Sequence, residues 1–213
     1  MADQNITLDY ASNIDFGDYG NNKRFDLYRK SYSPQKSKLE GGNLIVFYGP
    51  SCSGKTTIGK IIADMYSVHR VSLDLIRYKY FKDEKLFTDK NNREVFDLFV
   101  KILDFLIKEK QSVICEGILA SAERIEKLQK IHSNICFIYF TASLEILNDR
   151  LDKRYINMIN SEIVGKETLQ KEHLQDFYSI SSPLNDNVIN TETLNEKKAV
   201  KLVKKIIERF YKC

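Results

Sequence analysis

The residues best suited to chemistry form one continuous segment, Gly49-Pro50-Ser51-Cys52-Ser53-Gly54-Lys55-Thr56-Thr57. Its spacing of glycine, four residues, glycine, lysine and threonine is typical of a phosphate-binding loop. The glycines let the backbone wrap closely around phosphate oxygens, and N–H groups at the start of the next helix attract the anion. Lys55 would reach the β- and γ-phosphates, and the Thr56 hydroxyl would ligate Mg²⁺. We therefore expect all nine residues to bind a nucleoside triphosphate.

A second signal, Asp74 with Arg77, follows an apolar segment at residues 69–73. If that segment is a parallel strand, its carboxyl end faces the ligand crevice, and Asp74 lies near the γ-phosphate on the acceptor side. Three residues later, Arg77 would share its helical face. Such a carboxylate can accept the proton of an acceptor hydroxyl, and the arginine can hold an anionic group. The alternative is a helix-capping aspartate beside a solvated arginine.

Two further signals lie at the ends of later elements. Glu116 ends the apolar segment 112–116, where it could hold Mg²⁺ through water or touch the acceptor, and Gly117 would let a ligand approach the backbone. Arg150 and Arg154 are four residues apart, on one face of an expected helix, and could neutralise charge on a transferring phosphoryl group. The alternatives are an acid in a turn and a solvated basic face.

Alternating short apolar and longer amphipathic segments must position these side chains. Strands are expected at 43–48, 69–73, 112–116, 134–140 and 187–190, and helices at 54–67, 74–82, 91–110, 121–131, 143–154, 166–179 and 195–211. This order predicts right-handed crossovers and an α/β class, with a mostly parallel five-stranded sheet in a three-layer α/β/α arrangement. The polar residues 155–165 are the candidate for a lid that excludes water during transfer.

Residues 1–42 differ from the following domain, residues 43–213, because they are polar, glycine-punctuated and regularly aromatic. A disordered tail would usually carry fewer aromatic residues. We expect an extension that packs its aromatic side chains on the domain. Contact with a substrate or partner, and simple disorder, remain the alternatives.

Composition sets broad limits on function. A chain of 213 residues with 43% hydrophobic and 29% charged residues can fold as one α/β domain plus an appendage. The net charge of +4 is compatible with anionic ligands but too small to indicate nucleic-acid binding by itself. The four cysteines lack zinc-site spacing, and neither a signal peptide nor a membrane-spanning run is evident. We expect a cytoplasmic protein without a membrane partner.

Together these motifs resemble the P-loop kinases of small molecules and nucleic-acid ends. That broad AAA-like group includes polynucleotide 5′-hydroxyl kinases, zeta-toxin-type kinases, and gluconate and shikimate kinases. The resemblance covers residues 43–211 and implies a P-loop NTPase fold with a helical lid, ATP and Mg²⁺ as cofactors, and phosphoryl transfer to an alcohol group. Ser72-Leu73-Asp74-Leu75-Ile76-Arg77 resembles the group's S-x-D-x-x-R motif, which implies Asp74 as the base and Arg77 as an acceptor or phosphate contact.

The same resemblance extends to three other places. Arg150 and Arg154 are similar to the lid arginines, so catalytic roles are implied for them and for Lys55. Glu116-Gly117 resembles the zeta-toxin pattern more closely than the polynucleotide-kinase pattern, which often has Asp there. An adenine pocket is implied near Asn190 and Thr191.

The acceptor is left open between a small molecule, slightly favoured, and a nucleic-acid 5′-hydroxyl end. A nucleic-acid acceptor needs a basic, aromatic-lined channel, for which the candidates are Lys79, Tyr80, Lys82 and Lys85 with Lys23, Arg24, Arg29 and Lys30. A nucleoside monophosphate kinase is a further possibility, although it would need more arginines around the acceptor phosphate than the nine in this chain readily supply. From other classes, an NTPase switch and a nucleotide-binding scaffold remain.

Overall fold

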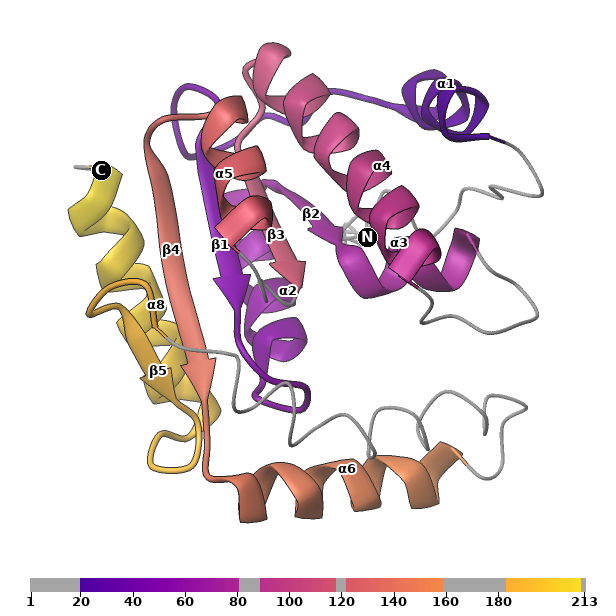
Figure 1. Cartoon of the computed structure of the whole chain (residues 1–213). Helices are drawn as coiled ribbons and strands as arrows, with labels where there is room; N and C mark the ends of the chain where they lie inside the picture. The colour runs from indigo at the N-terminus through magenta and orange to yellow at the C-terminus, as the bar shows by residue number, and fades with distance from the viewer. Residues whose placement is uncertain (1–19, 81–88, 118–121, 159–182, 212–213) are drawn as a thin grey trace, which may run out of the picture.

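The computed structural model describes residues 20–80, 89–117, 122–158 and 183–211 (Figure 1). Helices and strands alternate along most of these residues. The helices are α1 (Asn21–Ser31), α2 (Lys55–Tyr66), α3 (Leu73–Tyr80), α4 (Asp89–Lys108), α5 (Ala122–Ile131), α6 (Leu144–Met158) and α8 (Glu196–Tyr211). The strands are β1 (Leu44–Tyr48), β2 (His69–Ser72), β3 (Val113–Gly117), β4 (Ile135–Thr141) and β5 (Val188–Asn190).

The five strands form one sheet in the order β2-β3-β1-β4-β5, and every neighbouring pair is parallel. The predicted fold class and all five predicted strands are confirmed: β1, β2 and β5 differ from the prediction by one residue at one end, and β3 and β4 by one residue at both ends. Register pairs Tyr48 at the end of β1 with Gly117 and with Tyr139. The carboxyl ends of β1, β2 and β3 therefore meet at one edge, where the predicted chemistry lies.

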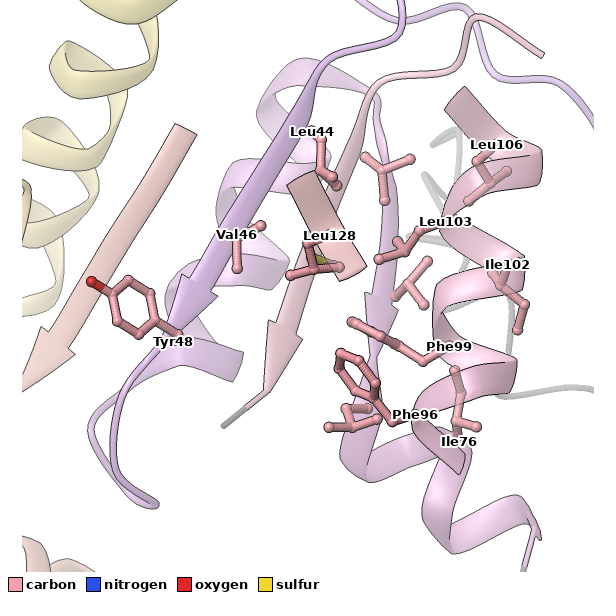
Figure 2. Packing of buried hydrophobic residues seen from close by; sticks show 14 of the residues in the cluster. Leu44, Val46, Tyr48, Ile76, Phe96, Phe99, Ile102, Leu103, Leu106 and Leu128 are labelled. Carbon is pink, nitrogen blue, oxygen red and sulfur yellow. The ribbon is translucent and has the colours of Figure 1, made fainter. Parts of the chain in front are cut away.

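Two hydrophobic clusters cover the two faces of the sheet. Leu44, Val46 and Tyr48 of β1 point into one cluster, which α4 dominates and to which Ile76 of α3 and Leu128 of α5 contribute (Figure 2). The intervening β1 residues point into the other cluster, against α2 and α8. This alternation produces the three layers, because each face of a parallel sheet must be covered.

Helix α1 belongs to the first face, beside α4 (Figure 1). Its aromatic side chains surround Phe105: the rings of Phe25, Tyr28 and Tyr32 meet it edge-on at centroid distances of 5.9, 6.2 and 5.0 Å. The prediction that the extension packs its aromatics on the domain is confirmed for these three residues. The predicted boundary at residue 42 stays a prediction.

Helix α6 departs from the sequence expectation. It was expected to end at residue 154, but it continues to Met158, so the first four residues of the predicted lid segment are helical. The remainder of that segment and the predicted helix 166–179 lie outside the described residues. None of the helices in the described ranges has the length and apolar character needed to cross a membrane.

Candidate active site

The loop between β1 and α2 needs glycine at both ends. Gly49 has φ 134°, and a Cβ there would lie 2.1 Å from the Phe140 carbonyl oxygen on β4. Gly54 has φ 90°, and a Cβ would lie 3.3 Å from a methyl carbon of Thr191. The loop is therefore pressed against the ends of its neighbouring strands, and its backbone conformation is accessible chiefly to glycine.

Lys55 begins α2 and is buried inside this loop. Its ammonium group donates hydrogen bonds to the Gly49 and Pro50 carbonyl oxygens at 2.9 and 2.5 Å, and to the Ser53 hydroxyl at 3.3 Å. Burial lowers the pKa of Lys55, whereas the negative charges of Asp74 and Glu116 raise it. Both predicted acids thus lie within electrostatic reach of the phosphate-binding lysine.

Asp74 lies in the first turn of α3, immediately after the carboxyl end of β2. Its Oδ1 accepts a hydrogen bond from the Arg77 guanidinium at 2.6 Å, so the predicted pair shares one helix face. The Asp74 side chain is 56% exposed, whereas that of Arg77 is 11% exposed. The carboxylate is accessible to a substrate, and the arginine holds its orientation from the more buried side.

Glu116 is buried at the end of β3 and forms an ion pair with Arg70 of β2. The pair lies under α2, because a Cβ on Gly59 would be 3.3 Å from Glu116 Oε2 and 3.6 Å from Arg70 Cδ. A role for Glu116 toward Mg²⁺ stays a prediction. Gly117 packs against Leu73, since a Cβ there would lie 3.0 Å from the Leu73 side chain. The approach of a ligand to the Gly117 backbone stays a prediction.

Arg150 projects from α6 toward the phosphate loop. Its guanidinium donates to the Cys52 carbonyl at 3.2 Å, and to the Thr191 hydroxyl and carbonyl, both at 2.8 Å. The Thr191 hydroxyl in turn donates to the Ser53 carbonyl at 3.1 Å. This network ties α6, the phosphate loop and the segment after β5 together.

Beside this network lies a cavity of about 400 Å³. It is lined by residues of the loop and α2, by Arg150, and by the segment that leads from β5 into α8: Cys52, Gly54, Thr57, Ile58, Arg150, Thr191, Leu194, Asn195, Glu196 and Ala199. Of the two positions named for an adenine pocket, Thr191 lines the cavity. Ligand pockets of this kind start at roughly 300 Å³.

Arg154 is exposed one turn further along α6, and its positive charge lowers the pKa of Lys55. The site therefore brings Lys55, Asp74, Glu116 and Arg154 into one electrostatic neighbourhood. Arg150 instead lines the cavity, where it contacts Cys52 and Thr191. Among the candidates for a nucleic-acid channel, Arg24 is buried and Arg29 lies over the Phe105 ring, while Lys82 and Lys85 lie outside the described residues.

Sequence reasoning missed two arginines. Arg70 is buried inside an apolar strand, where a charge needs a partner, so its burial in the segment HRVSL was the available signal. Arg124 lies in the first turn of α5, after β3, with its guanidinium 4.9 Å from the centroid of the Phe96 ring. The available signal for Arg124 was its position at the start of the helix that follows β3, the strand that carries Glu116 near its end.

The residues present fit ATP and Mg²⁺ as P-loop kinases use them. Thr56 and Thr57 are exposed on the first turn of α2, next to the buried Lys55. Within the described ranges, no group of three or more His, Cys, Asp or Glu side chains could hold a metal ion alone. Mg²⁺ suits such a site because it usually keeps several waters and binds through one or two protein ligands plus substrate phosphates. Thr56 is the protein ligand that the motif predicts.

Comparisons with known proteins agree with this fold. A family model described as an AAA domain matches residues 44–175, more than half of the chain. A cytidylate kinase of Staphylothermus marinus is 29% identical over 182 residues, which cover 79% of this chain and 98% of that enzyme. A sugar kinase from Janibacter matches with a TM-score of 0.60 at 15% identity, covering 78% of this chain and 94% of that structure. A gluconokinase from Sinorhizobium meliloti matches with 0.58 at 15% identity, covering 81% and 95%. Since identities are low, the two structures bear on the fold alone. The chain belongs to the AAA domain family, and its fold is that of the small P-loop kinases.

Proposed function

We propose that this protein transfers the γ-phosphoryl group of ATP to a hydroxyl group, with Asp74 as the general base. The observation that carries the proposal is the placement of Asp74: its accessible carboxylate follows β2, and its charge acts on the Lys55 ammonium. An acceptor bound at Asp74 would therefore lie beside the phosphate loop. Arg77 would keep the carboxylate oriented, and it supports the S-x-D-x-x-R resemblance to polynucleotide-kinase-like enzymes.

Acid–base chemistry favours a hydroxyl acceptor over a phosphate acceptor. A hydroxyl must lose its proton as the phosphoryl group transfers, so a carboxylate within reach assists the reaction. A phosphate acceptor is already ionised near neutral pH and needs no base. A substrate-facing carboxylate next to the phosphate loop therefore has a clear catalytic use only if the acceptor is a hydroxyl group.

The remaining residues divide between binding the nucleotide and stabilising charge. Gly49 to Thr57 would hold the phosphates, and Thr56 with Glu116 would act on Mg²⁺, which supplies charge neutralisation when bound. Arg150, held against Thr191 at the cavity, supports a role on the nucleoside side of ATP. Arg154 keeps the predicted role toward the transferring phosphoryl group, because its charge reaches Lys55.

A small-molecule acceptor is favoured over a nucleic-acid end. Arg24 and Arg29 of the candidate channel are engaged in packing α1 on the domain.

The relative in Staphylothermus is named a cytidylate kinase, and its match over 98% of that enzyme favours a second candidate, a nucleoside monophosphate acceptor. The two candidates differ in whether catalysis needs Asp74.

The test combines γ-labelled ATP and Mg²⁺ with an acceptor panel of sugars, sugar acids, nucleosides, nucleoside monophosphates, and 5′-hydroxyl DNA and RNA. Asp74→Asn is expected to lower kcat by about 10²- to 10⁴-fold on the preferred acceptor, because it removes the base and keeps the shape. The KM for ATP should stay within about twofold. The matched control is Asp26→Asn, an exposed position on α1.

Each other result points elsewhere. Transfer to CMP at equal rates in wild type and Asp74→Asn would mean that the acceptor is a phosphate group and not a hydroxyl group. Release of free phosphate at equal rates in both proteins, with no labelled acceptor, would favour a switch NTPase. ATP binding without any turnover would favour a scaffold.

A further inference from the structure

Helix α8 holds the largest net positive charge of the described helices. Its six basic and two acidic side chains leave a charge of +4, which equals the net charge of the whole chain. The rest of the chain is therefore neutral on balance. Five of the basic residues are exposed lysines that follow one another closely along the helix, and we call them the lysine face of α8: Lys197, Lys198, Lys201, Lys204 and Lys205.

The lysine face lacks the ion pairs that lysines of other helices form. On α4, α5 and α6, the ammonium groups of Lys108, Lys130 and Lys153 lie 2.6–2.8 Å from a carboxylate one helical turn earlier. On α8, Lys204 lies 3.5 Å from Glu208. The other four lysines of the face have no ion-pair partner among the residues that the structure describes. Their charges are therefore balanced only by solvent.

This arrangement of charge works against the helix that carries it. Lys197 and Lys201 are four residues apart, as are Lys201 and Lys205, and like charges at this spacing repel each other. Lys197 and Lys198 also lie in the first turn of α8, where the helix dipole favours negative groups. The stability of α8 therefore does not explain the lysine face, whereas a negatively charged partner would relieve both kinds of repulsion.

The position of α8 in the fold keeps the lysine face in solvent and away from the proposed base. The apolar side of the helix, which includes Val203 and Ile207, is buried in the cluster with α2. Leu202, 36% exposed, is the single exposed large hydrophobic side chain of α8. Helix α3, which carries Asp74, packs on the opposite face of the sheet (Figure 1). A partner on the lysine face would therefore leave the acceptor side open.

A linear polyanion fits this face better than a lipid surface does. The five lysines extend over about 12 Å of helix, and a nucleic-acid duplex carries one negative charge per about 1.7 Å of its axis. A helix that binds a membrane surface lays its apolar side into the lipid, but that side of α8 is buried in the domain. Single strands are bound by stacking on aromatic rings, and α8 has no aromatic residue between Glu196 and Arg209.

We propose that the lysine face of α8 binds the phosphate backbone of a double-stranded nucleic acid without reading its sequence. Ammonium groups contact phosphates as point charges, and such contacts carry no sequence information. This inference goes beyond the proposed function, because it concerns a surface on the other side of the sheet from Asp74 and needs neither ATP nor an acceptor. The duplex is a site of attachment for the protein and not the group that it phosphorylates.

The test measures the binding of fluorescent duplexes by anisotropy, without ATP. DNA and RNA duplexes of two unrelated sequences carry 5′-phosphorylated ends, so that no 5′-hydroxyl end is present. We expect binding at about 50 mM salt, with a slope of about −4 when the logarithm of the binding constant is plotted against that of the salt concentration, because about four phosphates are neutralised. Affinities for the two sequences should agree within about twofold.

Two triple variants test the lysine face with the same change in net charge. The face variant is K198Q/K201Q/K205Q, and the control on α4, α5 and α6 is K108Q/K130Q/K153Q. The face variant should bind duplex about 100-fold more weakly at about 50 mM salt, and its salt slope should shrink by about 3. The control should stay within about threefold of wild type. The urea midpoint of the face variant should equal or exceed that of wild type, because repulsion is removed.

Lysine acetylation of the wild-type protein, read by mass spectrometry, locates the contact without any variant. Duplex should protect Lys201 and Lys205 and leave Lys108 and Lys130 reactive. Equal protection of all four would overturn the proposal, as would equal losses of affinity in the two triple variants.

The wild-type protein alone also decides between partners. Failure to bind any duplex, or binding confined to single strands, would overturn the proposal. Binding to vesicles of phosphatidylcholine and phosphatidylserine in about a 2:1 ratio, with no binding to duplexes, would assign the face to a lipid surface instead. None of these measurements involves phosphoryl transfer, so a failure of the proposed function is seen only in the acceptor panel and a failure of this inference only here.

Discussion

Among single residues, His69 shows how burial sets a chemical property. It begins β2 with a fully buried side chain, its Nε2 donates to Gln111 Oε1 at 3.2 Å, and the Tyr32 ring lies 5.8 Å from its own. Burial lowers the pKa of His69 to about 4, and the Gln111 hydrogen bond opposes that shift only in part. An unfolded histidine titrates near ~6.5. Between these values, only the unfolded chain binds the proton.

The folded protein should therefore lose stability as pH falls through that window. Since the unfolded state binds more protons, the free energy of unfolding decreases from pH 6.5 toward pH 4, by about 3 kcal/mol from His69 alone. Urea unfolding at a series of pH values measures this slope. His69→Phe should flatten this slope, because it removes the titrating ring. Gln111 Oε1 keeps a partner in this variant, since the Gln35 backbone N–H donates to it at 2.8 Å. His132→Gln, at a partly exposed position, is the control. An unchanged slope in His69→Phe would contradict the assignment.

Residues that act through a fixed spacing could be predicted from the sequence, and residues that act through tertiary packing could not. Lys55, Asp74 and Arg77 belong to local sequence patterns. In the structure, the Arg77 guanidinium lies 2.6 Å from Asp74 Oδ1, as their spacing predicts. Arg124 reaches the same edge because α5 packs on α4 and its guanidinium lies on Phe96. That contact joins residues 28 positions apart, and no local pattern specifies it.

At the scale of elements, the phosphate loop depends on neighbours that are remote in sequence. Gly49 faces the Phe140 carbonyl on β4, and Gly54 faces Thr191 after β5. The loop motif requires these two glycines so that the backbone can approach the phosphates. In this protein both glycines are also required by packing, because a Cβ at either position would contact Phe140 or Thr191. The positions of strands and helices could be predicted from hydrophobic periodicity, but the order of strands in the sheet could not. The hydrophobic pattern of a strand determines which face of the sheet each side chain lies on, and it does not determine which strand lies next to it.

Gly49→Ala should damage the loop far more than a glycine substitution that meets only a backbone cost. A Cβ 2.1 Å from a backbone oxygen forces the strand end to move, so we expect a loss of about 3 kcal/mol or more and no measurable ATP binding. Gly41→Ala is the matched control: it also has a positive φ, 81°, but its Cβ would meet nothing within 4 Å. It should cost about 1–2 kcal/mol and leave ATP binding intact. Equal losses in urea unfolding would show that the Phe140 contact is relieved cheaply.

In the part of the chain that the structure describes, α1 of the predicted extension packs with the P-loop domain on one side of the sheet. Tyr28 of α1 is fully buried in the same cluster as Leu44 and Val46 of β1, the strand that leads into the phosphate loop. The sequence separated residues 1–42 by composition, and polarity explains why: one face of α1 is exposed, and only a few aromatic positions reach the core. Composition averages over both faces, so it could not reveal how much of α1 is integral.

If α1 is part of the cooperative unit, a cavity made there should destabilise the entire domain. Tyr28→Ala removes a ring packed on Phe105 at 6.2 Å and should lower the global free energy of unfolding by about 3–5 kcal/mol. Unfolding followed by tyrosine fluorescence and by loss of ATP binding should remain a single coincident transition. Asp26→Ala, exposed on the same helix, should change stability by no more than about 0.5 kcal/mol. Were α1 to detach on its own, Tyr28→Ala would instead leave the ATP-binding transition at the wild-type midpoint. The aromatic contacts would then be local to the extension, and the boundary at residue 42 would describe the folding units correctly.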